Sequence, residues 1–168
     1  MASEQAATDA VLWLSHAKPL RNLTAAHFRI VDGVPANGQR FGVVADSGSA
    51  AAALRLALDR PEDVTGIVLI APTLIAADGR AIDEALVAQL GALKPALLVL
   101  FGTKDTAAPP DAGRHYRERS ARANVVFVYD AGAAMGDERP EAVAELAIDF
   151  LKRGDAFIVR QTSDLLYR

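Results

Sequence analysis

A chain of 168 residues has the length of one domain and can bury enough apolar surface for a core of its own. Its formal net charge is −3, and acidic and basic residues are interspersed, which excludes the basic stripe of a nucleic-acid-binding protein. The chain has no cysteine, which excludes disulfides, thiolate catalysis and cysteine-ligated zinc.

The first nine residues carry neither the basic start nor the apolar run of a signal peptide, and no apolar run has the length needed to cross a bilayer. We therefore expect a cytoplasmic protein that contacts neither membrane nor nucleic acid and that holds no metal or other cofactor. We also expect a flexible N-terminus over residues 1–9, a single domain over 10–160 and a C-terminal tail over 161–168.

Six short apolar runs predict the strands of a sheet. They do not alternate apolar with polar residues, which is typical of strands buried on both faces. Helical patterns separate the runs, and this alternation predicts a parallel sheet covered by helices. The expected fold class is therefore α/β, a three-layer α/β/α sandwich with about six mostly parallel strands. The expected strands span residues 10–14, 28–31, 41–45, 66–70, 96–101 and 124–129.

Four helices are expected between and after these strands. The first begins with the small residues Ala50 to Ala53, which allow a close approach to the sheet. Apolar residues at helical spacing from Ile82 to Leu93 indicate the second. Pro110 and Pro140 each suit a first helical turn, and the helix that follows Pro140 has a clean apolar stripe. The expected helices span residues 49–58, 82–93, 110–119 and 140–151.

The most informative stretch is the buried strand, tight turn and helix over residues 41–50. Its centre is Ala45-Asp46-Ser47-Gly48-Ser49. It resembles the G-x-S-x-G nucleophile elbow of α/β-hydrolases, with both flanking glycines replaced by small residues. The resemblance assigns Ser47 to the nucleophile position, on a turn whose backbone is strained. The alternative is that any strand ending in a Ser-Gly turn produces this pattern.

The stretches that follow extend the resemblance to α/β-hydrolases over roughly residues 10–151. Residues 47–61 resemble the helix after the elbow, and residues 95–105 resemble the strand that delivers the triad acid. Gly102-Thr-Lys-Asp105 matches the family's Gly-x-x-Asp pattern, so the resemblance implies that Asp105 occupies the acid position. The alternative is an ordinary loop carboxylate.

A second register places Asp46 at the nucleophile position, as in haloalkane dehalogenases, with Gly48 on the closing glycine. This register puts the following helix and Pro61 out of step by one residue. We therefore favour Ser47.

The resemblance ends at the histidine of the triad. Residues 130–136 stand where the family has a Gly-x-Gly-His turn, and alignment on residues 138–141 places Ala133 at the histidine position. Serine is a poor nucleophile until a neighbouring base takes its proton, and histidine does so because its pKa lies near operating pH. Alanine cannot take or return that proton.

The other histidines offer no clear replacement. His16 follows the first strand and is a possible displaced base, although we favour a remnant of the family's His-Gly turn. His27 and His115 are interpreted as surface or capping residues. The resemblance gives the oxyanion hole the backbone N–H groups of Gly48 and Ala17, but the loop over residues 15–19 lacks glycines and ends in a proline, which has no N–H.

Several family elements are missing from the sequence. There is room for only one helix between Pro72 and Pro95, so we expect a minimal α/β-hydrolase core without a lid. Two strands that precede the first one in fuller members are also absent. We therefore expect residues 28–31 to form an exposed sheet edge, which invites a homo-oligomer or a protein partner.

Three classes of function remain open. The first is an α/β-hydrolase-like protein that lacks the triad histidine and acts by binding, as an accessory or oligomeric subunit. The second is a weak serine esterase that uses Ser47, Asp105 and a displaced base. The third is an anion-binding module at the turn over residues 47–49, which lacks the spacing and lysine of a P-loop. We favour the first, and expect no efficient turnover.

Overall fold

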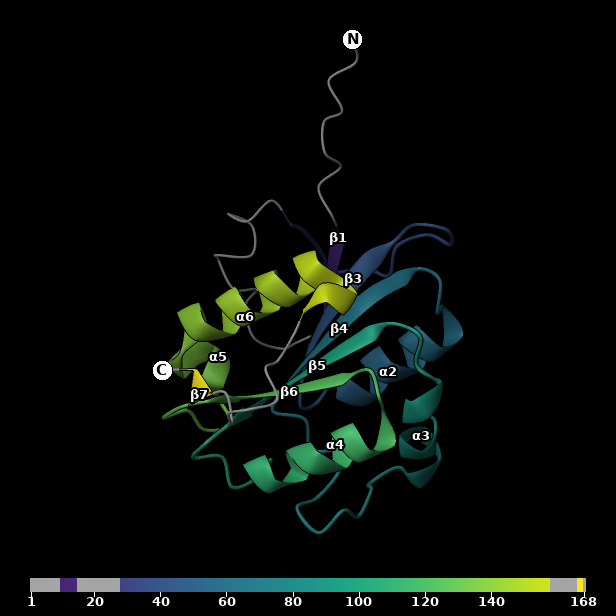
Figure 1. Ribbon diagram of the computed structural model, residues 1–168. Coiled ribbons are helices and arrows are strands. Elements are labelled where there is room, and N and C mark those ends of the chain that lie inside the picture. The colour runs from purple at the N-terminus through teal and green to yellow at the C-terminus, as the bar shows by residue number, and fades with distance from the viewer. Residues whose placement is uncertain (1–9, 15–27, 158–165, 168) are drawn as a thin grey trace.

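The computed structural model describes residues 10–14, 28–157 and 166–167 (Figure 1). The described strands form one seven-stranded sheet in the order β2-β1-β3-β4-β5-β6-β7, and each neighbouring pair is parallel. The strands are β1 (Ala10–Leu14), β2 (Arg29–Val31), β3 (Phe41–Asp46), β4 (Val64–Ile70), β5 (Ala96–Gly102), β6 (Ala123–Val128) and β7 (Leu166–Tyr167).

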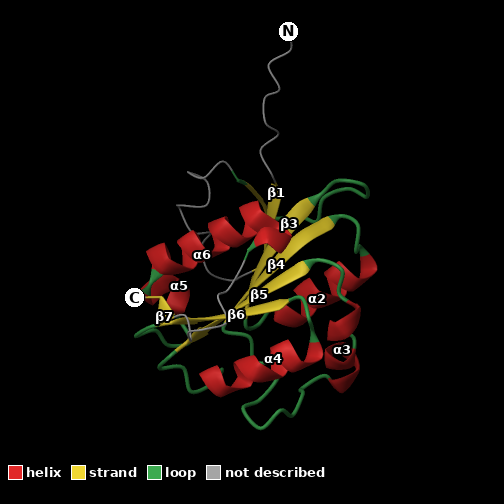
Figure 2. Cartoon of the chain, in the orientation of Figure 1, coloured by secondary structure: helices red, strands yellow, loops and turns green. Residues whose placement is uncertain are grey.

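Helices cover both faces of the sheet (Figure 2). The helix α6 lies on one face, and α2, α3 and α4 lie on the other. The helices are α2 (Ala50–Asp59), α3 (Glu84–Ala88), α4 (Gly113–Arg119), α5 (Met135–Glu138) and α6 (Pro140–Arg153), with short 3₁₀ turns η1 (Leu90–Ala92), η2 (Pro110–Ala112) and η3 (Gly154–Ala156). The expected α/β class, the layered arrangement and the six longer strands are confirmed.

The six expected strands lie within two residues of the observed ones. They are predictable because the central strands are buried on both faces, so their apolar runs are continuous. The short strand β7, which pairs with β6 through Leu166 and Tyr167, was not expected. Strand β2 lies at one edge of the sheet, as expected, and pairs only with β1 in the described part of the chain.

Small residues let the two helical layers approach the sheet. Ala50, Ala53 and Ala57 of α2 are fully buried against it. On the other face, a Cβ atom at Gly42 would lie 2.8 Å from a methyl carbon of Leu151, so the Leu151 side chain at this end of α6 packs closely against β3. Small residues therefore accompany the close approach of both helices to the sheet.

The second expected helix is shorter than the sequence predicts. Asp83 caps α3, since its Oδ1 accepts a hydrogen bond from the Leu86 N–H at 3.0 Å. Ile82 therefore precedes the helix and is 75% exposed, which corrects its assignment to the apolar stripe. The third helix begins as the 3₁₀ turn η2 and becomes α4 only at Gly113.

A loop connects β2 to β3, and Arg60 holds its middle in place. The guanidinium of Arg60 donates to the carbonyl oxygens of Pro35 at 2.5 Å and Ala36 at 2.7 Å, and also to the carboxylate of Asp63. It lies over the Phe41 ring, 5.1 Å from the ring centroid. The Asp63 carboxylate accepts bonds from Arg60 and from the Gly38 N–H, and these bonds lower the pKa of Asp63.

Candidate functional site

Ser47 lies in a turn at the carboxyl end of β3, directly before α2. The Ser49 N–H donates to the Asp46 carbonyl oxygen at 3.0 Å, which closes the turn, and the Ala53 N–H donates to the Ser49 carbonyl oxygen to start the helix. Ser47 and Gly48 are exposed. The strand–turn–helix context predicted for this stretch is thus present.

The strained backbone expected at Ser47 is absent. The only non-glycine residues with positive φ in the described part of the chain are Ala71 and Asp130. The bond from Ser49 to Asp46 spans three residues and closes an ordinary β-turn, in which no residue needs the left-handed region. The turn at Ser47 therefore lacks the backbone strain of a nucleophile elbow.

Asp105 lies at the carboxyl end of β5 and is 5% exposed. Its Oδ1 accepts hydrogen bonds from the N–H groups of Ala107 at 2.8 Å and Ala108 at 3.0 Å. Its Oδ2 is buried and has no hydrogen-bond partner among the described residues. Oδ1 therefore accepts two backbone hydrogen bonds, while Oδ2 accepts none from the described residues.

The loop that carries Asp105 is bonded to the loop after β6. The Thr103 N–H donates to the Val128 carbonyl oxygen at 3.1 Å, and the Lys104 N–H donates to the Ala131 carbonyl oxygen at 2.9 Å. The Asp130 N–H donates in return to Thr103 Oγ1 at 2.9 Å. These bonds explain why the pattern needs Gly102, where a Cβ atom would lie 2.2 Å from the Ala131 carbonyl oxygen.

Charge reinforces the same contact between the two loops. The ammonium of Lys104 forms an ion pair with the Asp130 carboxylate, and both side chains are exposed. This pair raises the pKa of Lys104 and lowers the pKa of Asp130. Neither residue was a candidate in the sequence, because a surface lysine in one loop gives no signal about a carboxylate in another.

Ala133 lies in the loop that follows β6, beyond the residues bonded to the Asp105 loop. It is exposed, and the loop around it is tied down by the Gly132 N–H, which donates to Glu138 Oε2 at 2.6 Å. Arg139 closes the other end by donating to the Tyr129 carbonyl oxygen at 2.7 Å. Ala133 therefore lies on a well-bonded loop beside the loop that carries Asp105.

Among the described residues, no histidine is hydrogen-bonded to Ser47 as a base. His16 and Ala17, the possible base and oxyanion donor, and His27 lie outside those residues. His115 does not lie on the surface as predicted: it is 8% exposed. Its Nε2 lies 3.0 Å from the Ala77 carbonyl oxygen and its Nδ1 3.2 Å from Glu118 Oε2, so the ring anchors the loop after β4 to α4.

The two described candidates, Ser47 and Asp105, lie at the same end of the sheet, where the parallel strands end. Ser47 follows β3 and Asp105 follows β5, and β4 lies between these strands. Gly48, the other oxyanion candidate, follows Ser47 at this edge. The topology therefore brings Ser47, Gly48 and Asp105 to the same end of the parallel strands.

Comparison with solved structures identifies the architecture. The chain resembles a predicted CIB-like hydrolase from Thermoplasma acidophilum, with a TM-score of 0.68 and 14% identity over 90% of this chain and 89% of that one. It also resembles Rv0554 from Mycobacterium tuberculosis, with a TM-score of 0.69 and 16% identity over 87% and 90% of the two chains. The chain has the α/β-hydrolase fold.

A third similar structure is MGS-MChE2, an α/β hydrolase enzyme from a metagenome of sediments of the Mar Chica lagoon, Morocco. It has a TM-score of 0.71 and 13% identity over 86% of this chain and 91% of that one. The sequence matches no protein-family model and no curated protein. At these identities the likeness establishes the α/β-hydrolase fold alone.

The α/β-hydrolase fold carries no lid insertion between β4 and β5 in this chain. Residues 71–95 hold only α3 and η1 between the two strands, as the sequence predicts. In the described part of the chain, no helix combines the length and apolar character that a membrane crossing requires.

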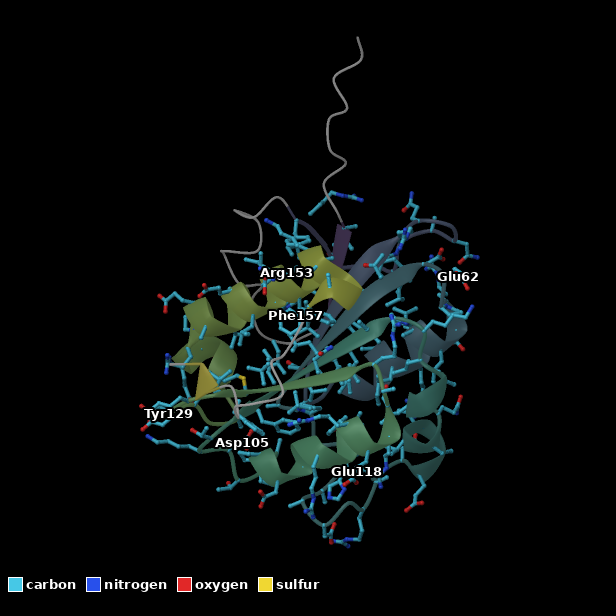
Figure 3. The ribbon with its side chains drawn as sticks, viewed as in Figure 1. Glu62, Asp105, Glu118, Tyr129, Arg153 and Phe157 are labelled. Carbon is cyan, nitrogen blue, oxygen red and sulfur yellow. The ribbon has the colours of Figure 1, made fainter. Side chains whose placement is uncertain are left out.

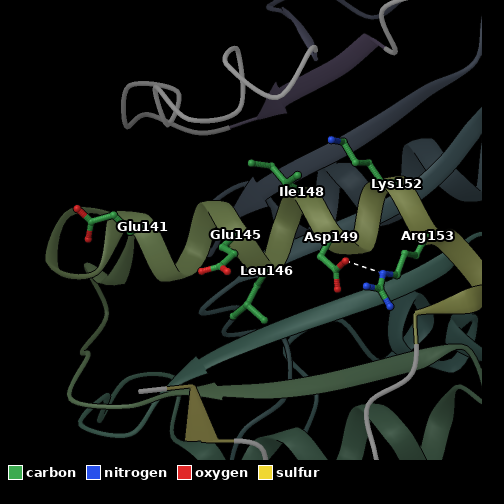
Figure 4. Close-up of a pocket in the computed structure, with 7 residues that line it drawn as sticks. All are labelled: Glu141, Glu145, Leu146, Ile148, Asp149, Lys152 and Arg153. Atoms are coloured by element: carbon green, nitrogen blue, oxygen red, sulfur yellow. Dashed lines mark ion pairs between the residues drawn. The ribbon is translucent and has the colours of Figure 1, made fainter. Parts of the chain in front are cut away.

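A hollow of about 690 Å³ runs along α6 (Figure 4). Every described residue that lines it belongs to α6, among them three carboxylates and the basic pair Lys152 and Arg153. Ser47, Asp105 and Ala133 do not line it.

Proposed function

We propose that this chain is a non-catalytic α/β-hydrolase-like protein that acts by binding, as a homo-oligomer or as an accessory subunit. The observation that carries the proposal is the state of Asp105. Its carboxylate keeps the two backbone bonds that hold it in place, while the buried Oδ2 has no partner among the described residues. In a working triad the acid would orient a histidine.

The chemistry of the serine supports the same conclusion. A serine hydroxyl attacks an acyl group efficiently only when a base removes its proton and returns it to the leaving group. Ala133, at the aligned position, can do neither. Loss of a triad member leaves only the roughly 10³–10⁴-fold acceleration that the oxyanion hole and binding supply. The unstrained turn at Ser47 also argues against a preorganised nucleophile.

A fluorophosphonate probe tests this proposal on the full chain. We expect labelling no faster than that of a denatured control, with no difference between the wild type and Ser47→Ala. Ser49→Ala is a matched control, because it removes a neighbouring hydroxyl of the same turn. Rapid labelling that is lost in Ser47→Ala and kept in Ser49→Ala would overturn the proposal.

The second candidate function is a weak serine esterase. It is favoured by the exposed position of Ser47 at the same sheet edge as the retained acid Asp105. It needs a displaced base such as His16. The probe separates the two candidates, because only the esterase predicts that His16→Ala and Ser47→Ala abolish the same labelling.

The binding role has a surface to act through at β2. This edge strand pairs with β1 alone among the described strands, its Arg29 is exposed, and Val34 just beyond it is 54% exposed. An unpaired strand edge offers its backbone groups to a second chain. Light scattering should therefore give a mass above that of the monomer, unless a separate partner is required.

A charged residue on this edge gives a sharper test of self-association. We expect Arg29→Glu together with Val34→Lys to shift the mass toward the monomer, whereas Ile82→Lys, an exposed aliphatic site elsewhere, should not. A wild type that stays monomeric at high concentration and binds no protein partner through β2 would contradict the edge proposal.

A further inference from the structure

A second hollow, of about 380 Å³, lies at the end of the sheet where the parallel strands begin, opposite the end that carries Ser47 and Asp105. It lies among the amino ends of β3 to β6 and the last turn of α6. Figure 3 shows Glu62 and Arg153, two of its lining residues, on a different side of the molecule from Asp105 and Tyr129. We call it the basic hollow; its basic lining residues are Arg40, Lys94, Arg122, Lys152 and Arg153.

The topology explains why these residues meet. Arg40 and Arg122 each directly precede a strand, β3 and β6, and Lys94 precedes β5 by one further residue. Parallel strands all begin at the same end of the sheet. Because α6 runs in the direction opposite to the strands, its last residues, Lys152 and Arg153, lie at that same end. The five side chains come from four segments that are distant in sequence.

The charge of the lining is strongly one-sided. Among the lining residues that the structure describes, five are basic and one, Glu62, is acidic, in a chain whose formal net charge is −3. Glu62 forms an ion pair with Lys94, and the Arg153 Nε lies 2.6 Å from Asp149 Oδ1. Arg40 and Lys152 are exposed and have no ion-pair partner among the described residues.

Concentrating charge of one sign in a concavity favours a ligand of the opposite sign. A cleft lined by one sign of charge focuses the field and raises the local concentration of counter-ions. Guanidinium groups bind carboxylate and phosphate oxygens through paired hydrogen bonds, and ammonium groups bind them as point charges. The exposed hydroxyl of Thr65 adds a neutral donor to the same lining.

We propose that the basic hollow binds a small multivalent oxyanion, a polyphosphate or a polycarboxylate. The spread of the basic groups over separate segments favours a ligand with more than one anionic group, because a single group cannot contact them all. The volume lies in the range of small-molecule sites. This site is independent of Ser47 and Asp105.

Isothermal titration calorimetry on the full chain tests the proposal at low ionic strength. The probes are sodium tripolyphosphate and citrate, with chloride of equal ionic strength as the reference. We expect saturable binding of at least one of the two, weakened by added salt because the contacts are between charges. Binding of tripolyphosphate alone assigns phosphate chemistry, and binding of both assigns multivalent oxyanions in general.

Two double variants with the same change in charge locate the site. Arg40→Gln with Lys152→Gln removes two basic groups from the hollow that support no other described ion pair. Arg114→Gln with Arg117→Gln removes two exposed basic groups of α4, which does not line the hollow. We expect the first pair to weaken binding at least about tenfold, since charge-assisted contacts are lost, and the second to leave it within about twofold.

Two results would overturn the inference. One is the absence of saturable binding by either anion, and the other is an equal loss of affinity in both double variants. Melting temperatures of the free variants confirm that each is folded. Fluorophosphonate reactivity should be the same in all of them, so failure of this site leaves the proposal for Ser47 unaffected.

Discussion

Replacing Asp105 with asparagine and with alanine measures directly whether its second oxygen has a partner. The two carboxylate oxygens of Asp105 have different surroundings. Oδ1 accepts bonds from the N–H groups of Ala107 and Ala108, whereas Oδ2 is buried without a partner among the described residues. An asparagine at this position can still accept the two backbone hydrogen bonds through its side-chain oxygen, whereas an alanine can accept neither.

The magnitudes follow from the hydrogen bonds. A bond to a charged group contributes about 1.5–3 kcal/mol, and a buried N–H left without an acceptor costs about 1–3 kcal/mol. Asp105→Ala removes both bonds to Oδ1, so we expect it to lower the free energy of unfolding by about 3 kcal/mol or more. Asp105→Asn keeps a carbonyl oxygen in place and removes a buried charge, so we expect a change of less than about 1 kcal/mol.

Urea unfolding of the three proteins provides the assay, with the midpoint compared at constant slope. Asp111→Ala, an exposed carboxylate on η2, is the control for removal of a negative charge. If asparagine destabilised the protein as much as alanine, Oδ2 would have to hold a charged donor in the folded protein. That result would refute the claim that Asp105 Oδ2 has no partner, and it would favour a working acid–base pair.

Three further predictions concern the same loops and the region around Arg60. Ala133→His alone should not produce an efficient esterase in a p-nitrophenyl acetate assay, because the turn at the serine lacks strain, and a large gain would show the rest of the site to be intact. Gly102→Ala should lower the melting temperature sharply, because its Cβ would lie 2.2 Å from the Ala131 carbonyl oxygen, and an unchanged melting curve would contradict this contact. The pKa of Asp63 is lowered by its bonds to Arg60, so the stability it contributes is present above its usual pKa of about 3.9 and is lost as the pH falls through its folded value. Asp63→Asn should therefore flatten the acid limb of the stability profile, and an identical limb in both proteins would contradict that role.

The tight turn after β5 that carries Asp105 was predictable from local pattern. Gly102 and Asp105 stand in a short motif at the end of an apolar run, and the structure gives each a local reason: close contact for the glycine, and two backbone bonds for the carboxylate. The strain expected at Ser47 was wrong, because the Ser49 N–H closes the turn on Asp46 in an unstrained geometry. Turn geometry depends on backbone bonds that the residue types alone do not determine.

Ile82 and His115 show where pattern fails. Ile82 has the helical spacing of a core residue, but the cap at Asp83 starts the helix at Glu84, two residues later, and leaves the Ile82 side chain exposed. His115 lies on a helix whose apolar pattern is weak, and it is buried because a loop nearly 40 residues away packs its Ala77 carbonyl oxygen against the ring. Burial of a polar residue is set by its distant neighbours.

The amino-acid sequence alone determined the layer architecture, because strands buried on both faces must be continuous apolar runs and the helices between them must carry an apolar face. It also determined which sheet edge carries Ser47 and Asp105, since both follow parallel strands. Only the tertiary structure joined Lys104 to Asp130 and gathered Arg40, Lys94 and Arg122 around one hollow. These contacts link segments far apart in the chain, and their existence depends on strand order and helix direction rather than on any local pattern.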